Sequence, residues 1–377
     1  MDPVHNRRVR TLLLALLLLS GSAAAQRVRT EHVELQVETV AGGLEHPWGL
    51  AFLPDGRFLV TERPGRLRIV GADGRLSQPL GGVPSRIAVR GQGGLLDVAL
   101  DPAFAENRLV YLSFSERREG AENGTSVARG RLNAAGTGLE GTQVIFRQQP
   151  AYAGAAHFGS RLVFDRTGAL FVTLGDRYDL RDQAQVPGNH LGKLVRIRPE
   201  GGPAPGNPGL EGWAPEIWSI GHRNVQGAAL NPVTGELWTA EHGARGGDEV
   251  NVPRAGRNYG WPTITYGRDY SGARIGEGTE KPGLEQPLHY WDPSIAPSGL
   301  AFYTGDAFPA WRGHVLVGAL AGQHLARLEF SGERLVHEER LLGDLGERIR
   351  DVRQGPDGLV YLLTDQERGR LLRLRPR

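Results

Sequence analysis

One recurring pattern constrains the fold of this chain more than any other feature. An apolar stretch leads into a turn built on Asp or Asn with Gly or Pro, and a second apolar, β-rich stretch follows. These turn residues favour a tight reversal between two alternating strands, so each copy is expected to form a β-hairpin. Six copies occur, at residues 49–61, 96–114, 162–174, 228–239, 299–318 and 352–363.

The spacing of the copies predicts how the hairpins are arranged. They lie about 45–75 residues apart, which suits a four-stranded blade with its loops. Six copies therefore predict an all-β fold, a six-bladed β-propeller of four-stranded antiparallel blades. A β-sandwich would not explain the repetition. The longest stretches between copies, residues 175–215 and 243–290, are expected to be loops over one face, where functional residues gather.

The N-terminus resembles an export signal. Arg7, Arg8 and Arg10 precede a Leu-rich segment at 11–20 and a small-residue cleavage site at 23–25. Residues 1–25 are thus expected to be a signal peptide, and residues 26–377 a single propeller domain in the periplasm or outside the cell. The paired arginines leave both the general secretory and the twin-arginine export routes open. No later segment is long and apolar enough to span a bilayer.

Composition excludes several classes of function. The chain has no Cys, which rules out disulfides, thiolate metal sites and thiol nucleophiles. It carries 44 basic and 42 acidic residues, and removal of residues 1–25 leaves 41 of each. A nearly neutral mature chain does not predict a basic face for nucleic acid.

Two polar residues flank the third hairpin and could perform acid–base chemistry. His157 precedes it, and Asp176 follows it. A histidine at the mouth of a pocket can act as a general base, and a nearby carboxylate can fix its tautomer. Taken alone, His157 is more simply interpreted as a structural histidine. Gln92 precedes the second hairpin in a Gly-rich segment that lacks the strand–turn–helix context of a phosphate loop.

Other polar pairs also stand before a hairpin. Arg223 and Asn224 enter the fourth one, where they could bind a ligand or simply close the loop. Arg348 and Arg350 are two residues apart, so a strand would place them on one side. Two such arginines suit an acidic ligand, although an exposed basic strand is the simpler interpretation of this pair alone.

The segment 241–251 could bind a metal ion. It combines Gly with several carboxylates and backbone carbonyls, which are the oxygen ligands that Ca²⁺ prefers. It does not follow the EF-hand pattern, and a solvated acidic turn is the simpler interpretation of this segment alone. In a propeller, however, equivalent points of successive blades converge at one end of the channel. These clusters are therefore expected to face one pocket.

The ordered set of motifs resembles the soluble PQQ-dependent glucose and aldose sugar dehydrogenases. The similarity spans residues 37–374, and the order of the motifs is more specific than any one of them. Gly221-His-Arg-Asn224 is one example. The matching segments are residues 46–52, 91–97, 157–161, 221–224, 247–251, 258–262, 293–298 and 348–352.

The resemblance implies a role for each candidate residue. His157 would take the proton from the C1 hydroxyl of an aldose, Asp176 would orient it, and Arg223 would stabilise negative charge on the quinone oxygen. The hydride of C1 would pass to PQQ, leaving a lactone. The implied contacts of the cofactor are Gln92, Arg223, Asn224, Tyr270, Arg348 and Arg350.

Two calcium sites are also implied by the resemblance. The backbone carbonyls of Gly243 and Ala244 would hold an active-site ion that polarises the quinone. Glu249 and Tyr259 resemble a second, structural site. One departure concerns the cofactor: the glucose dehydrogenases place a Lys where this chain has Ala321, so one charged contact is lost.

Two other functions compete with a sugar dehydrogenase that passes electrons to an external acceptor. A non-catalytic propeller that binds sugar or protein would not need the polar residues to converge. A lactonase-type hydrolase needs several carboxylate or Asn ligands around an axial metal. The carboxylates here cluster mainly on one loop, which disfavours that reaction.

Overall fold

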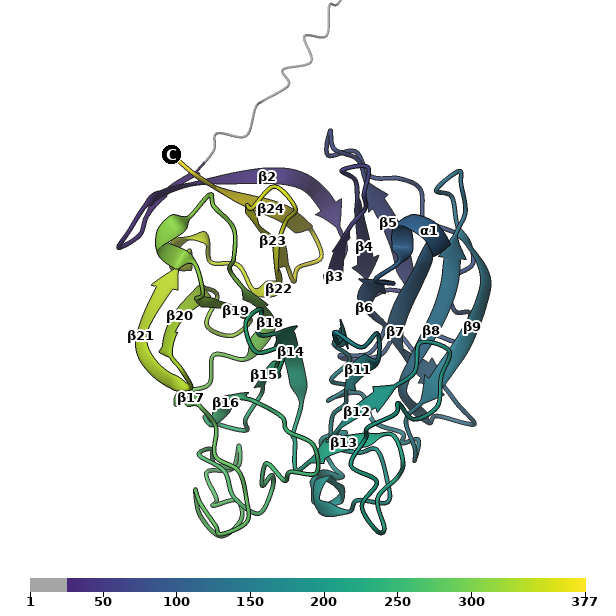
Figure 1. The fold of residues 1–377 in the computed structure, drawn as a ribbon, viewed down its shortest axis with the longest axis vertical. Coiled ribbons are helices and arrows are strands. Elements are labelled where there is room, and N and C mark those ends of the chain that lie inside the picture. Colours follow the sequence, from purple (N-terminus) through teal and green to yellow (C-terminus); the bar gives the residue numbers. More distant parts are fainter. Residues whose placement is uncertain (1–25) are drawn as a thin grey trace, which may run out of the picture.

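The computed structural model describes residues 26–377, and the predicted signal peptide lies outside them. Six antiparallel sheets surround a central axis, so the prediction of an all-β six-bladed propeller is confirmed (Figure 1). In this part of the chain no helix is long and apolar enough to cross a membrane. The helical segments are α1 (Phe104–Asn107) and the 3₁₀ helices η1 (Arg181–Gln185), η2 (Pro309–Trp311) and η3 (Gly343–Leu345).

Each predicted hairpin forms the first two strands of one blade. The first strand of every blade faces the axis, and neighbouring first strands contact one another around the ring. In blades 1 to 6 these pairs are β3 (Pro47–Phe52) and β4 (Phe58–Glu62), β6 (Leu95–Leu100) and β7 (Leu109–Arg117), β10 (Leu162–Phe164) and β11 (Leu170–Thr173), β14 (Val225–Leu230) and β15 (Leu237–Glu241), β18 (Pro297–Phe302) and β19 (Val315–Ala319), and β22 (Ile349–Gln354) and β23 (Val360–Thr364).

The outer strands depart in part from the predicted four per blade. Blades 2 to 5 have four strands, but the sheet of blade 1 has three and that of blade 6 has five. The segment that follows the third strand of blade 1 contains Pro79 and Pro84, which cannot donate to a ladder. The outer strands are β5 (Arg66–Val70), β8 (Asn123–Leu132), β9 (Leu139–Arg147), β12 (Lys193–Ile197), β13 (Ile217–Ile220), β16 (Asp248–Asn251), β17 (His289–Trp291), β20 (Leu325–Ser331), β21 (Arg334–Leu341), β24 (Gly369–Pro376), β2 (Glu34–Leu44) and β1 (Gln26–Arg29).

The expectation that residues 175–215 and 243–290 are entirely loops is wrong in part. Strand β12 lies inside the first stretch, and β16 and the start of β17 lie inside the second. The acidic start of β16, Asp248 and Glu249, hides the apolar alternation that marks a strand. Both stretches nevertheless contribute long connections to the candidate site.

The two ends of the described chain close the ring. Strand β2 pairs with β24 from Leu35 opposite Pro376 to Leu44 opposite Gly369, with two irregularities in the register. Figure 1 shows the purple β2 running beside the yellow β24. The sixth blade is therefore assembled from both ends of the sequence, which leaves no open gap between blades 6 and 1.

Apolar side chains fill the interfaces between the blades. Six buried clusters correspond to the six interfaces, and each draws residues from two neighbouring sheets. At the interface of blades 2 and 3, for example, Tyr111 packs edge-on against Phe164 at 5.0 Å between ring centroids. Because the stability resides in these interfaces, the loops at the ends of the channel are available for function.

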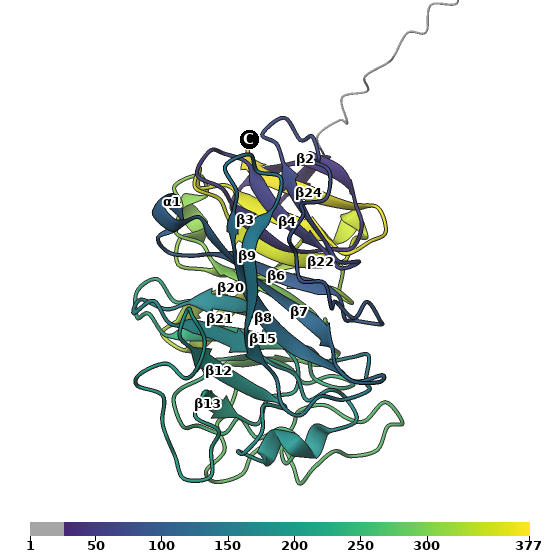
Figure 2. The same cartoon turned by 90° about the vertical axis from the view of Figure 1, so that its right-hand side faces the viewer.

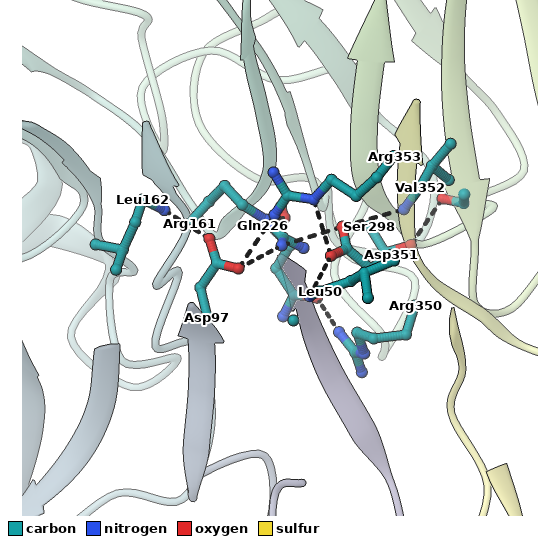
Figure 3. A network of polar contacts seen from close by, with 12 residues as sticks. Leu50, Asp97, Arg161, Leu162, Gln226, Ser298, Arg350, Asp351, Val352 and Arg353 are labelled. Atoms are coloured by element: carbon teal, nitrogen blue, oxygen red, sulfur yellow. Dashed lines mark hydrogen bonds and ion pairs between the residues drawn. The ribbon is translucent and has the colours of Figure 1, made fainter. Parts of the chain in front are cut away.

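A buried group of charges crosses the axis. This axial network consists of Asp97, Arg161, Asp351 and Arg353 (Figure 3). Arg161 Nη1 lies 2.9 Å from Asp97 Oδ1 and 3.1 Å from Asp351 Oδ1. Arg353 reaches the same two carboxylates at 3.2 and 3.0 Å. Two cations thus balance two anions, and the network joins blades 2, 3 and 6.

Candidate active site

The predicted site residues gather at one end of the central channel. This end, called the site mouth below, is lined by the turns that precede the first strand of each blade and those that follow the second. Gln92 precedes β6, His157 precedes β10, and Arg223 precedes β14. Cross-blade hydrogen bonds join them: the His157 amide donates to Gln92 Oε1 at 2.8 Å, and the Asp176 amide donates to the Arg223 carbonyl at 2.9 Å.

His157 and Asp176 form a buried pair. His157 Nδ1 lies 2.6 Å from Asp176 Oδ1, and the side chains are 5% and 0% exposed. Asp176 also accepts hydrogen bonds from the Tyr178 amide and from Trp261 Nε1, each at 2.8 Å. Three donors therefore fix the carboxylate. The contact at Nδ1 leaves Nε2 as the ring nitrogen that makes no hydrogen bond within residues 26–377.

The surroundings of His157 favour its neutral form. Burial lowers the pKa of the imidazole, and the positive charge of Arg223 lowers it further, against the opposite effect of Asp176. Because a depressed pKa leaves the ring unprotonated at neutral pH, Nε2 carries a free lone pair there. The pair therefore has the geometry and the charge state of a general base with its orienting carboxylate.

Arg177 holds the loop that carries His157. Its buried guanidinium donates to the carbonyls of Ala156 and Gly154 at 3.0 and 2.9 Å, and lies 4.1 Å over the Phe158 ring. His157 itself has a φ of 53°, a left-handed conformation that a non-glycine residue adopts only when its surroundings enforce it. The three contacts of Arg177 with this short loop supply that enforcement.

Arg223 and Asn224 lie beside the pair. The Arg223 amide donates to Glu241 Oε2 at 2.7 Å, and its guanidinium donates to the Gly243 carbonyl and lies 5.2 Å over the Trp261 ring. Asn224 Oδ1 accepts from the Gly159 amide at 3.1 Å. Among residues 26–377, the buried Asn224 Nδ2 has no hydrogen-bond partner.

Two arginines, Arg348 and Arg350, line the opposite side of the site mouth. Arg350 donates to Gln226 Oε1 at 2.6 Å and to Asp365 Oδ2 at 2.5 Å, and its buried Nε has no partner in the described part of the chain. Arg348 lies 3.9 Å from the same Asp365 oxygen, so the two arginines do share one side. Ala321 is exposed and follows Leu320, whose carbonyl accepts from Arg348 Nη1 at 3.3 Å.

An open pocket of about 320 Å³ adjoins the His157–Asp176 pair, because Tyr178 and Trp261, which both donate to Asp176, line it. Tyr178 packs edge-on against His157 at 5.1 Å and lies parallel to Tyr270 at 6.4 Å. Aromatic faces beside carboxylates suit a compound that carries both C–H faces and hydroxyl groups. The lining residues are Tyr178, Asp179, Arg181, Arg223, Ala244, Trp261, Asp269, Tyr270 and Ile275.

The residues assigned to calcium lie in two adjoining places. Ala244 lines the open pocket, while Gly243, Glu249 and Tyr259 line a small cavity of about 10 Å³, room for one water-sized particle. Burial, reinforced by the neighbouring Glu241 carboxylate, raises the pKa of Glu249 to about 8. A bound cation would stabilise the ionised form of this carboxylate, so the donor set fits a hard metal ion.

Other details restrict how a metal ion could bind. The Tyr259 hydroxyl already donates to the Val252 carbonyl and accepts from the Arg254 amide, so Tyr259 could offer only its own carbonyl. Within residues 26–377 no three His, Asp or Glu side chains are grouped to hold a metal. Backbone carbonyls such as those of Gly243 and Ala244 would therefore have to supply further ligands.

Three contributors to the site were missed by the sequence interpretation. Trp261 belongs to the segment 258–262, yet its contact with Asp176 was not expected. Asp365 and Gln226 hold Arg350 in place. Asp365 stands just after a second strand and Gln226 within a first strand, so the repeat itself was the signal that could have identified these two. Trp261 lies in the long connection between β16 and β17, outside the repeated hairpin.

The fold and the site together define a class of protein: a propeller with a histidine–carboxylate pair at one mouth of its channel, opposite two arginines. The chain belongs to the glucose/sorbosone dehydrogenase family, whose model matches residues 44–373. A relative, the aldose sugar dehydrogenase YliI of Escherichia coli (strain K12), is 46% identical over 348 residues, which cover 91% of this chain and 93% of the relative.

Solved structures agree with this assignment. A crystal structure described as glucose dehydrogenase superposes with a TM-score of 0.87 at 54% identity, covering 89% of this chain and 98% of the other. The PQQ-bound form of an aldose sugar dehydrogenase from Streptomyces coelicolor superposes with a TM-score of 0.76 at 31% identity, covering 90% and 98%.

The chemistry of the site mouth fits PQQ. Asn224 Nδ2 and Arg350 Nε are buried donors that lack a partner within residues 26–377, and Arg348 stands beside them. Such donors and cations require an acidic ligand rich in acceptor oxygens. PQQ, with three carboxylates and two quinone oxygens, is such a ligand.

Proposed function

We propose that this protein is a PQQ-dependent dehydrogenase that oxidises the C1 hydroxyl of aldose sugars to the lactone. The observation that carries the proposal is the buried His157–Asp176 pair, whose contacts Tyr178 and Trp261 line a pocket with aromatic and acidic residues, close to unpartnered donors. The printed descriptions of the relatives from Escherichia coli and Streptomyces coelicolor, an aldose sugar dehydrogenase and a PQQ-bound one, support the substrate class and the cofactor.

In this mechanism, His157 Nε2 accepts the proton of the sugar C1 hydroxyl. Asp176 holds the ring through Nδ1 and stabilises the imidazolium that forms, while Trp261 and the Tyr178 amide hold Asp176 in place. The chemistry that PQQ supplies when bound is the acceptance of the hydride from C1. Arg223 places its positive charge where negative charge develops, a form of electrostatic stabilisation that contributes strongly in a dry site.

The proposed cofactor contacts follow the geometry of the site mouth. Gln92 and Asn224 offer amide groups from blades 2 and 4, and Arg348 and Arg350 offer cations for the carboxylates. Tyr270, 57% exposed, would provide a ring face at the pocket. The proposed contacts are Gln92, Arg223, Asn224, Tyr270, Arg348 and Arg350.

Calcium is proposed at the two places described above. The Gly243 and Ala244 carbonyls would hold an ion close to Arg223, where it could polarise the cofactor as a Lewis acid. Glu249 and the Tyr259 carbonyl would hold a second ion that stabilises the loop. The electrons would leave to an external acceptor, and the leader at residues 1–25 would direct the chain to the periplasm or out of the cell.

A reconstitution assay tests the proposal. The protein would be incubated with PQQ and Ca²⁺, and dye reduction followed with glucose and a panel of aldoses, for the unchanged chain, His157→Ala and the exposed control His32→Ala. We expect activity that needs PQQ and falls about 10²–10⁴-fold in His157→Ala only. PQQ binding without loss of turnover in that variant would exclude His157 as the base. Failure of the unchanged chain to bind PQQ would favour the non-catalytic binding propeller.

A further inference from the structure

The position immediately after the second strand of a blade faces the site mouth. In blade 6 it is Asp365, whose amide donates to the Arg348 carbonyl at 2.8 Å, and in blade 4 it is His242, whose amide donates to the Asn224 carbonyl at 3.1 Å. Asp365 binds Arg350, and the His242 carbonyl accepts from Arg223 Nη1 at 3.2 Å. In both blades, then, this position contacts residues of the proposed cofactor site.

Blade 1 carries an arginine at this equivalent position. The Arg63 amide donates to the His46 carbonyl at 3.0 Å, which repeats the hydrogen bond of the other two blades. None of the cofactor contacts proposed above comes from blade 1, although it stands between the blades that supply Arg348 and Gln92. Arg63 fills that gap in the ring of contacts.

The side chain of Arg63 extends toward the loop that carries Gln92. Its Nη1 donates to the carbonyl of Gly91, and its own carbonyl accepts from the Leu95 amide at 3.1 Å. The approach requires glycine at Gly94, because a Cβ there would lie 1.9 Å from the Arg63 carbonyl oxygen. Arg63 is therefore packed against the proposed cofactor loop, and two of its side-chain nitrogens remain available.

The charge around Arg63 is unbalanced. Arg63 makes no ion pair within the described residues, since Glu62 is bound to Arg66 and Arg68. Asp365, which binds Arg350, also contacts His46 Nδ1 at 2.9 Å, and the His46 carbonyl accepts from the Arg63 amide, so Arg63 is joined to this pair through one residue. Arg348 and Arg350 share one carboxylate, Asp365, whereas Arg63 has no carboxylate partner within residues 26–377. A bound anion would balance the excess positive charge of this cluster.

We propose that Arg63 is an additional PQQ-binding residue, whose charge replaces the lysine that the glucose dehydrogenases have at the position of Ala321. The inference rests on the proposed function. Arg348 connects the two positions. Its guanidinium reaches the Leu320 carbonyl, next to Ala321, and lies 3.9 Å from Asp365, which contacts His46, the residue that accepts from the Arg63 amide. A cation from blade 1 would therefore face the same carboxylate-rich edge of the cofactor as a cation from blade 5.

The test measures binding of PQQ to the cofactor-free protein by quenching of tryptophan fluorescence, at low and at high salt. We expect Arg63→Gln to weaken binding about tenfold and to reduce its salt dependence, because one charge-assisted contact is removed. Arg75→Gln is the matched control: it removes the same charge from a side chain that is 89% exposed on a distant turn of blade 1, and it should leave binding unchanged.

A double substitution separates a charge contact from support of the loop. Ala321→Lys should restore most of the lost affinity in the Arg63→Gln background and add less to the unchanged chain, since both cations serve the same carboxylates. Arg63→Lys, which keeps the charge without the fork, should bind more tightly than Arg63→Gln.

Equal PQQ affinity in Arg63→Gln and the unchanged chain would overturn the inference alone. So would an equal gain from Ala321→Lys in both backgrounds. No binding to the unchanged chain, with or without Ca²⁺, would overturn the proposed function and the inference with it.

Discussion

Two groups of charged residues near the propeller axis differ in their balance of charge. The axial network holds two aspartates and two arginines in direct contact, and its charges cancel. At the site mouth, Arg348 and Arg350 share the single carboxylate of Asp365, and Arg63 has no ion-pair partner within the described residues. Both groups come from the same inner turns and strands of the blades, so position in the fold does not explain the difference.

The difference indicates what each group is for. A buried charge without a partner costs several kcal/mol, so a group that only joins blades must be neutral. One Arg161 nitrogen lacks a hydrogen-bond partner, but its guanidinium lies 4.4 Å over the Trp48 ring. An excess of cations and unpartnered donors is tolerated at the site mouth because a bound acidic ligand would complete it.

The largest effect should come from breaking the axial network. Asp97→Asn would leave the buried Arg161 and the partly buried Arg353 with one carboxylate between them. We expect the free energy of unfolding to fall by about 3–5 kcal/mol, measured by urea denaturation. Asp73→Asn, at an exposed turn, is the control. A loss below about 1 kcal/mol would mean that the network does not hold the blades together.

A smaller effect is expected at the buried carboxylate of the site mouth. Asp176 accepts from one ring nitrogen and two neutral donors rather than from a buried arginine. Asp176→Asn should therefore lower kcat about 10²-fold, or about 2.7 kcal/mol in the barrier, because the amide no longer fixes the imidazole. PQQ affinity should be unchanged. If stability falls as far as in Asp97→Asn, the two regions would not differ in the way inferred here.

Arg348→Gln tests the unbalanced cluster directly. Its side chain is 44% exposed and lies 3.9 Å from Asp365, so it contributes little to folding. We expect PQQ to bind about tenfold more weakly, whereas the free energy of unfolding of the cofactor-free protein changes by less than about 0.5 kcal/mol. The opposite result, a stability loss with intact PQQ binding, would assign this arginine to the scaffold.

The smallest effect concerns a buried cation outside both groups. Burial lowers the pKa of Lys193 to about 7, and its ammonium donates to the Gln183 carbonyl at 2.8 Å. The folded state therefore binds this proton less tightly than the unfolded chain, so stability should fall as the pH decreases from about 10 toward 7. Lys193→Met should flatten this part of the stability curve by about 1 kcal/mol. An unchanged slope would show that the ammonium is not desolvated.

Local chemistry explains why much of the fold could be predicted. Each hairpin is encoded by a few adjacent residues, such as the Asp55 side chain that accepts from the Arg57 amide at 3.2 Å in the first turn. Once six equivalent hairpins are recognised, symmetry brings Gln92, His157 and Arg223 to one end. The strand count of blade 1 and the strand β16 were not predictable in this way, because prolines and acidic residues obscure the period-two pattern there.

Contacts across the axis could not be predicted. Trp261 and Asp176 are 85 residues apart, and Asp97 and Arg353 are 256 residues apart. No periodicity in the sequence states which carboxylate a distant arginine will meet. The choice depends on the exact depth of each inner strand in the channel, which only the packed blades determine.

The pairing of β2 with β24 has a consequence for biosynthesis. Strand β24, which completes blade 6, is synthesised after all the other described strands, and its partner β2 is among the first of them. Until β24 has been synthesised, one edge of β2 and the outer edge of β23 lack their partner strand. Such unpaired strand edges promote aggregation. A nascent chain stalled before Gly369 would therefore be an open ring and a substrate for chaperones and proteases. A chain that includes β24 can pair it with β2 and close the ring.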